Sequence, residues 1–148
     1  MIFKRTFDQR FIHECLTQPH VWEMVRSDDT PNPKDFVPPM SDRCIWVRAG
    51  NSGLIMVIAT SDTTYDIHLG LRRRVKGGCV KLLHKALIWF TEQYPDWEVL
   101  TTSVPSDNIL AKGLALHFGF QIIGLDATTV VRDGKPLELT KLKLDRRT

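Results

Sequence analysis

The chain has few cysteines, and they form no pairing pattern. Its 148 residues include only Cys15, Cys44 and Cys79, which are far apart and contain no CxxC pair. An odd, widely spaced set supports neither a disulfide framework nor a zinc site. We therefore expect reduced thiols, a cytoplasmic location and no bound metal.

Long hydrophobic runs and a large excess of charge are also missing. The longest apolar run, residues 54–59, is far shorter than the roughly 20 residues that span a bilayer, and the N-terminus has no signal-peptide hydrophobic region. These absences argue against membrane insertion and secretion. The net charge of +3 at pH 7 is small, which argues against nucleic acid as the partner.

The sequence does have the size and the hydrophobic fraction of one domain over residues 1–148. With 43% hydrophobic residues it can bury a sizeable core. The periodicity of the apolar residues predicts the order β, α, α, β, β, β, α, β, α, β, β. The expected ranges are a strand over 1–7, a helix capped by Asp8, a helix over 21–25, strands over 44–48, 54–60 and 64–71, a helix over 78–94, a strand over 98–104, a helix over 109–118, and strands over 120–131 and 136–144.

Two segments between the predicted helices and strands have residue patterns typical of a loop and of a turn. Residues 27–41 contain four prolines, which predict a long surface loop, and loops of that length are usually functional or mobile. The pair Asp133-Gly134 stands between two apolar runs and is typical of a two-residue hairpin turn.

Positive charge is concentrated where a predicted strand gives way to a predicted helix. The segment Arg72-Arg73-Arg74-Val75-Lys76-Gly77-Gly78 holds four cations and two glycines. Unpaired N–H groups and the dipole favour an anion at a helix start, and glycine allows it to approach the backbone closely. The junction therefore suits a phosphate group, although a tight turn with solvated arginines has the same residue types. Neither GxxxxGK[ST] nor GxGxxG occurs, so the usual nucleotide motifs are not supported.

Two motifs resemble one known family. Arg74-x-x-Gly77-x-Cys79 resembles the Q/R-x-x-G-x-G/A segment of the GNAT superfamily of N-acetyltransferases, and residues 108–120, NILAKGLALHFGF, resemble its N-x-x-A-x-x-L-Y-x-x-x-G-F helix. Both occur in order, separated by one helix and one strand. The resemblance implies an α/β (α+β) fold of three layers. Its mixed, mostly antiparallel sheet would have six to seven strands, splayed between the fourth and fifth, and about four flanking helices.

The same resemblance implies an acyl donor and its binding residues. Acetyl-CoA would lie between the splayed strands, with its pyrophosphate on the loop amides and its pantetheine arm beside the helix over 109–118. A neutral amine would attack the thioester, which requires a general base and a proton donor for the departing thiolate. The implied acetyl-CoA-binding residues are Leu69, Leu71, Arg72, Arg73, Arg74, Val75, Lys76, Gly77, Gly78, Cys79, Asn108 and Ala111.

The chain departs from the family pattern at the catalytic positions. Ala115 stands where the family commonly has the tyrosine that protonates the thiolate. Tyr65 and Thr63 occupy the two positions where many relatives carry the base, and neither is a base at neutral pH. Tyr65 is, however, an alternative proton donor. Strand alternation puts Asp66 and His68 on the opposite face unless a bulge changes the parity. The candidate catalytic residues are thus Tyr65, Asp66 and His68.

Two functions stay open. One is an acyl-CoA-dependent N-acyltransferase that moves an acetyl group to a small-molecule or peptide amine. The alternative is a catalytically silent protein of the same fold that serves as a binding or assembly component, because the customary acid and base are both missing. A fainter whole-chain resemblance to small head-assembly proteins of short-tailed phages implies phage structural proteins as partners in that case. It also implies a location in the cytoplasm of a bacterial host or in the virion.

Overall fold

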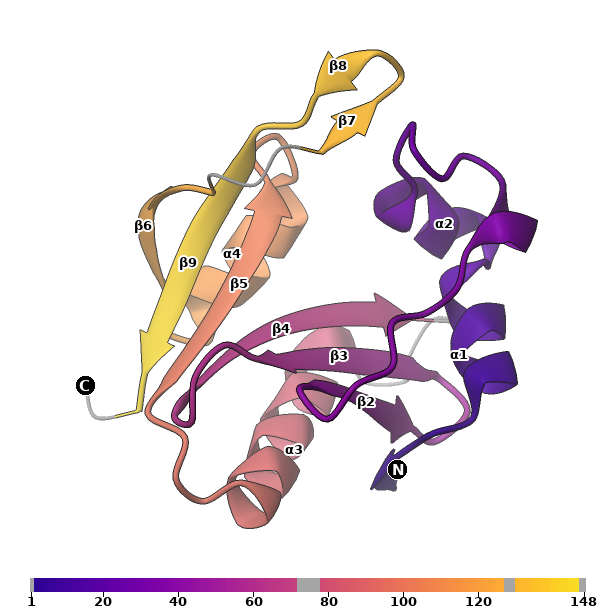
Figure 1. The fold of residues 1–148 in the computed structure, drawn as a ribbon. Helices are drawn as coiled ribbons and strands as arrows, with labels where there is room; N and C mark the ends of the chain where they lie inside the picture. Colours follow the sequence, from indigo (N-terminus) through magenta and orange to yellow (C-terminus); the bar gives the residue numbers. More distant parts are fainter. Residues whose placement is uncertain (1, 72–77, 127–129, 147–148) are drawn as a thin grey trace.

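The computed structural model describes residues 2–71, 78–126 and 130–146 (Figure 1). No helix in those ranges is long and apolar enough to cross a membrane. The elements, in chain order, are β1 (Phe3–Arg5), α1 (Gln9–Leu16), α2 (Pro19–Val25), the 3-10 helix η1 (Pro33–Asp35), β2 (Cys44–Ala49), β3 (Gly53–Ala59), β4 (Thr64–Leu71), α3 (Gly78–Gln93), β5 (Val99–Pro105), α4 (Ile109–His117), β6 (Gln121–Leu125), β7 (Val131–Arg132), β8 (Lys135–Pro136) and β9 (Leu139–Asp145).

The framework is a seven-stranded sheet in the order β1-β2-β3-β4-β5-β9-β6. Neighbouring strands are antiparallel except β4 and β5, which are parallel. These two strands pair at three positions only, from Thr64↔Val99 to Asp66↔Thr101, although both continue beyond them. They then diverge, as Figure 1 shows. The expected splay between the fourth and fifth strands is confirmed.

The first half of the sheet is covered on both faces, which gives three layers. Side chains alternate between the faces of a strand, so the nearly continuous apolar runs of β2 and β3 supply both. On one face lies α3, whose buried side chains recur at every fourth residue: Leu82, Ala86 and Phe90. On the other face α1 buries Phe11, Ile12, Cys15 and Leu16 among residues of β2 and β3. The predicted three-layer arrangement is confirmed.

The start of α1 has a simple physical cause. The carboxylate of Asp8 accepts a hydrogen bond from the Phe11 N–H at 3.1 Å, which caps the helix as the sequence predicts. A helix of eight residues is marginal by itself, so its buried apolar face is what holds it in place.

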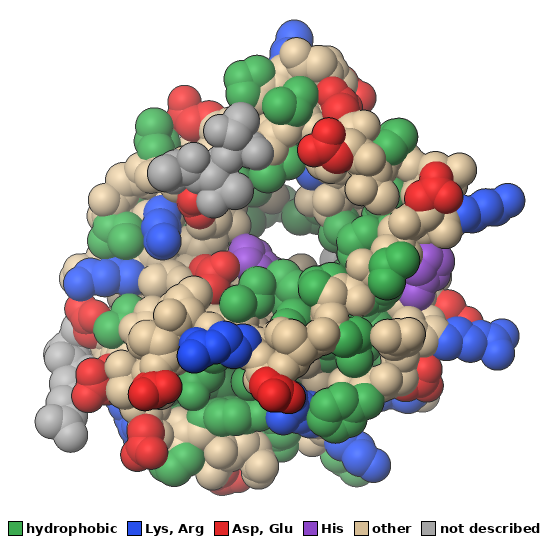
Figure 2. Space-filling view, viewed as in Figure 1, with side chains coloured by type: hydrophobic (Ala, Val, Ile, Leu, Met, Phe, Trp, Pro, Cys, Tyr) green, Lys and Arg blue, Asp and Glu red, His purple; other side chains and the backbone are tan. Residues whose placement is uncertain are grey.

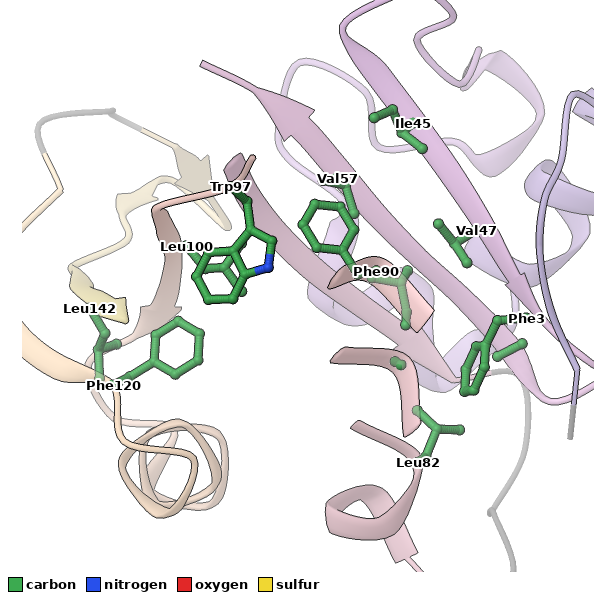
Figure 3. Close-up of a cluster of buried hydrophobic side chains, with 13 residues drawn as sticks. Phe3, Ile45, Val47, Val57, Leu82, Phe90, Trp97, Leu100, Phe120 and Leu142 are labelled. Carbon is green, nitrogen blue, oxygen red and sulfur yellow. The ribbon is translucent and has the colours of Figure 1, made fainter. Parts of the chain in front are cut away.

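The core on the α3 face continues into the second half of the sheet. Leu100 of β5, Leu142 of β9 and Phe120 belong to the same buried cluster as Phe90 (Figure 3). Helix α4 covers this half, and its Ala115 packs against the cluster. Among the described residues, the apolar cluster beneath α1 includes none from β5, β6 or β9. That cluster therefore covers only the first half of the sheet.

The C-terminal region differs from the sequence prediction. Alternation over 120–131 predicts one strand, but β6 ends at Leu125, after a bulge between Ile122 and Gly124 where Gly124 has φ +138°. The chain returns through the separate β7–β8 hairpin before β9 begins. Asp133 and Gly134 form the two-residue turn as predicted, with φ +54° and +74°, the signs that a type I′ turn requires.

Candidate active site

The point where β4 leaves β5 carries polar side chains from both strands. Asp66↔Thr101 is the last backbone pair. One residue further, the hydroxyl of Thr102 donates to the carbonyl of Ile67 at 2.8 Å and so replaces the next ladder bond. The divergence is thus stabilised by side chains, and it leaves a space between the two strands.

Asp66 and His68 form a hydrogen-bonded pair at this point. Oδ2 of Asp66 lies 2.8 Å from Nε2 of His68, and Oδ1 accepts a hydrogen bond of 2.8 Å from the Thr101 hydroxyl. The side chains of His68 and Asp66 are 36% and 22% exposed, so solvent or a substrate can reach both. When Nε2 carries the ring proton, Asp66 fixes the orientation of the imidazole and leaves Nδ1 as an acceptor.

Side chains alternate between the two faces of β4, so an uninterrupted register decides which face Asp66 and His68 occupy. The register between β3 and β4 is continuous from Gly53↔Leu71 to Ala59↔Tyr65, so the described strands contain no bulge that would change it. Asp66 and His68 therefore share a face with their partners Ile58 and Met56, which pack toward α1.

Tyr65 points to the α3 face instead. Its ring makes an edge contact with Phe90, with centroids 5.2 Å apart, and a tilted contact with Tyr94. Burial raises the pKa of the Tyr65 phenol, and the charges of Tyr94, Asp62 and Asp96 add to the rise. The phenol therefore stays protonated at neutral pH and is able to donate a proton. The structure does not bring it onto the same face as His68.

Strand β5 carries a second hydroxyl and carboxylate pair that sequence reasoning missed. Ser103 lies two residues beyond Thr101, on the same face, and its hydroxyl donates to the carboxylate of Asp126 after β6. The alternation of Thr101 and Ser103 within a predicted strand is the only signal in the sequence. Their partners come from segments 35 and 23 residues away, which local patterns do not reveal.

The structure describes part of the predicted acetyl-CoA site. Arg72, Arg73, Arg74, Val75, Lys76 and Gly77 lie outside the described residues. Leu71 ends β4, Leu69 packs against the core on the α3 face, and Cys79 is half-buried in the first turn of α3. Gly78 opens α3 with φ +80°, and a Cβ built on it would meet no atom within 4 Å. A ligand is therefore able to approach the backbone of Gly78.

At α4, Asn108 and Ala111 lie together because one caps the other. Oδ1 of Asn108 accepts a hydrogen bond from the Ala111 N–H at 3.1 Å. This bond fixes the start of α4 beside the end of β5. Within the ranges that the structure describes, no three His, Cys, Asp or Glu side chains gather in a way that would hold a metal ion.

An opening runs through the molecule next to the diverging strands. Figure 2 shows it near the centre of the view, and the same view in Figure 1 has β4, β5, α2 and the β7–β8 hairpin around it. The space at the strand divergence is thus accessible, with the chain enclosing it in this view.

Comparisons with known proteins agree with this geometry at the level of the fold. No protein-family description matches the chain, and neither does any curated protein sequence. An aminoglycoside N(6')acetyltransferase from Legionella pneumophila is similar in structure, with a TM-score of 0.70, 20% identity, and coverage of 97% of this chain and 91% of that one. The spermidine N-acetyltransferase from Vibrio cholerae, solved with CoA and spermine, gives a TM-score of 0.72 and 14% identity over 98% and 95%.

A GNAT-family acetyltransferase from Bacillus anthracis is also similar, with a TM-score of 0.69 and 12% identity over 99% of this chain and 95% of that one. The likeness covers nearly the whole length of every chain in these pairs. The chain therefore has the fold of the GNAT acetyltransferases, as its two sequence motifs imply.

Proposed function

We propose that this protein is an acyl-CoA-dependent N-acyltransferase that moves an acetyl group from acetyl-CoA to a primary amine. The observation that carries the proposal is the divergence of β4 from β5 with the Asp66–His68 pair beside it. The likeness in fold to acetyltransferases that act on aminoglycosides and on spermidine supports it, because their acceptors are amines.

Acetyl-CoA would lie between β4 and β5, with its phosphates at the start of α3. The helix start supplies unpaired N–H groups, Gly78 leaves room for close approach, and Arg74 and Lys76 add positive charge just before it in the sequence. Beyond Asp66, β4 no longer pairs with β5, and its backbone at Leu69 and Leu71 would hold the thioester end.

The amine would react on the face that carries His68. Nδ1 of His68 would take a proton from the ammonium group, and Asp66 would stabilise the resulting imidazolium. The neutral amine would then attack the thioester carbonyl, forming the C–N bond and breaking the C–S bond. The departing thiolate would take the proton that the amine nitrogen loses on becoming an amide, since Ala115 has no proton to give and Tyr65 packs against Phe90 on the other face.

A turnover assay with variants of His68 tests this proposal. The release of free CoA thiol is measured with acetyl-CoA and a panel of primary amines. For His68→Gln we expect a loss of about 100-fold or more in kcat with unchanged affinity for acetyl-CoA, which is the usual contribution of a general base. The matched control is His117→Gln, an exposed histidine at the end of α4. Equal rates for His68→Gln and the intact protein would contradict the assigned role.

A second candidate function is a binding or assembly component that does no chemistry. Ala115 favours it, because α4 offers no acid at the position that is customary in the family, and its small side chain packs against the core instead. The structures compared above are acetyltransferases and give the phage resemblance no support. A protein that binds acetyl-CoA but transfers no acetyl group to any amine would fit this candidate.

A further inference from the structure

The residues of β9 alternate between a buried face and a polar face. Thr140 and Leu142 are buried, and Leu142 belongs to the core that α4 covers. Because side chains alternate along a strand, Lys141 and Lys143 point to the opposite face. Both lysines are half-buried, and the apolar cluster beneath α1 does not extend over them. This half of the sheet therefore has a polar face that carries positive charge.

The candidate catalytic pair lies on the same face. The register of β5 and β9 places Lys143 opposite Thr101 and Lys141 opposite Ser103. Directly opposite residues of paired strands share a face, with Cβ atoms about 5 Å apart. Thr101 binds the Asp66 carboxylate from this face. The two lysines therefore lie one strand beyond the hydroxyls of β5, on the face where we place the attacking amine.

The two lysines differ in their partners. The Lys143 ammonium lies 3.3 Å from the carboxylate of Asp145. The Lys141 ammonium makes no hydrogen bond or ion pair with any residue that the structure describes. The hydroxyl of Ser103, directly opposite Lys141, donates to Asp126. Lys141 thus offers a positive charge that is available to a ligand on this face.

The sign of the charge changes from β4 to β9. Asp66 supplies negative charge at β4, the hydroxyls of β5 follow, and Lys141 supplies positive charge on β9. An ammonium group beside Asp66 and a carboxylate beside Lys141 would both be attracted, whereas a second ammonium group at Lys141 would be repelled. In Figure 2 a histidine lies at the edge of the opening, and Lys or Arg side chains lie on the β6–β9 side of it.

We propose that Lys141 binds a carboxylate of the acceptor and that the acceptor is a small amino acid. Lys141 is displaced from Thr101 by one strand and two residues, about 8 Å between Cβ atoms. The flexible lysine side chain shortens this span, so the amine and the carboxylate of the acceptor are only a few bonds apart. The carboxylate contact would turn the amine toward Nδ1 of His68. The inference rests on the proposed acyltransfer to an amine, and it names the class of that amine.

The test compares amino acids with their amides in the thiol-release assay. Glycine, β-alanine and γ-aminobutyrate are each paired with the amide of the same chain length, which keeps the amine but has no negative charge. Values of kcat/KM are calculated for the neutral amine, because the paired compounds differ in amine pKa. For the intact protein we expect the best amino acid to exceed its amide by about tenfold or more, the scale of a hydrogen bond to a charged group.

Substitution of Lys141 connects the preference to this residue. In Lys141→Gln we expect the preference to fall to about threefold or less, through a higher KM for the amino acid with little change in kcat. The matched control is Lys4→Gln, which removes the same charge from an exposed side chain of β1, at the other edge of the sheet. This control should keep the preference. The affinity for acetyl-CoA and the thermal midpoint are measured for both variants, to show that the donor site and the fold are unchanged.

The outcomes separate this inference from the transferase function. Turnover of other primary amines but of no amino acid would overturn the role of Lys141 alone. Equal kcat/KM for amino acids and amides, or a preference that Lys141→Gln leaves unchanged, would do the same. Acetyl-CoA binding with no turnover of any amine would overturn both the transferase function and this inference.

Discussion

At the residue scale, the candidate site depends on side chains that cross from one strand to the next. Thr101 binds one carboxylate oxygen of Asp66, and His68 binds the other, so the orientation of the imidazole depends on a residue of β5 that does not touch it. Thr101 is in this sense a positioning residue.

Substitution of Thr101 tests that role. Thr101→Val keeps the shape of the side chain but removes the hydroxyl, which leaves Asp66 free to turn. We expect kcat to fall about tenfold with unchanged KM for acetyl-CoA, and we expect Thr101→Ser to restore most of the rate because it keeps the hydroxyl. A Thr101→Ser variant as slow as Thr101→Val would show that packing, rather than the hydrogen bond, is what matters.

The phenol of Tyr65 gives a second test at this scale. The pKa of Tyr65 is raised mainly by burial, with contributions from Tyr94, Asp62 and Asp96. The pKa of Tyr65 in the folded protein lies above the unfolded value of about 10. The protonated phenol therefore contributes its full stabilisation of the folded state below that pH, and the contribution is lost as the pH rises through the folded pKa. In Tyr94→Phe, Tyr65 is the only tyrosine left, so an absorbance titration of the phenolate reports it directly. A midpoint at or below the ordinary value would contradict this environment.

At the element scale, the sequence predicts regular elements well and irregular ones poorly. The bounds of β4 match the prediction at both ends, and α3 and α4 each end one residue before the predicted end. Helix α1 has the predicted cap, Asp8. Each of these helices has a cap, a glycine or a proline beside a periodic apolar run. The strand expected over 120–131 is too long: β6 covers only Gln121–Leu125, because the positive φ of Gly124 breaks the alternation. The hydrogen bonds from the β7–β8 turn to Asp28 cannot be predicted from local sequence patterns, because the donors and the acceptor lie over 100 residues apart.

The stabilisation from the ion pair between Arg26 and Asp133 of the β7–β8 turn depends on pH, and its direction follows from the pKa of Asp133. The hydrogen bond from Arg26 lowers the pKa of the Asp133 carboxyl, and the nearby charges of Arg26 and Arg132 lower it further, while Glu23 shares Arg26. Because the pKa of Asp133 is lower in the folded protein, its ionised carboxylate stabilises the folded state fully above the ordinary pKa of about 4. This stabilisation is lost as the pH falls through the folded pKa.

An NMR titration of the side-chain carboxyl measures this effect. We expect Asp133 to titrate below its ordinary range in the intact protein and to return toward it in Arg26→Gln, which keeps hydrogen-bonding capacity but removes the charge. An unchanged pKa of Asp133 in Arg26→Gln would mean that the ion pair between Arg26 and Asp133 does not form in solution.

At the scale of the whole molecule, one core on the α3 face connects the two halves of a sheet whose central strands pair at three positions. Leu142, fully buried, lies in the second half of that core. We expect Leu142→Ala to lower the free energy of unfolding by about 2–5 kcal/mol through the cavity that it leaves. Leu125→Ala, at a side chain that is 66% exposed, should change it by about 0.5 kcal/mol or less. Urea denaturation compares the two, and equal losses would contradict the position of the core.

The central claim is that this fold binds acetyl-CoA between β4 and β5, with the phosphates at the start of α3. Calorimetric titration of the purified protein with acetyl-CoA tests it most directly, alongside an Arg74→Glu, Gly77→Glu double variant that adds negative charge and bulk to the predicted phosphate loop. We expect micromolar binding by the intact protein and none by the variant. The absence of binding by the intact protein would contradict the proposed transferase function.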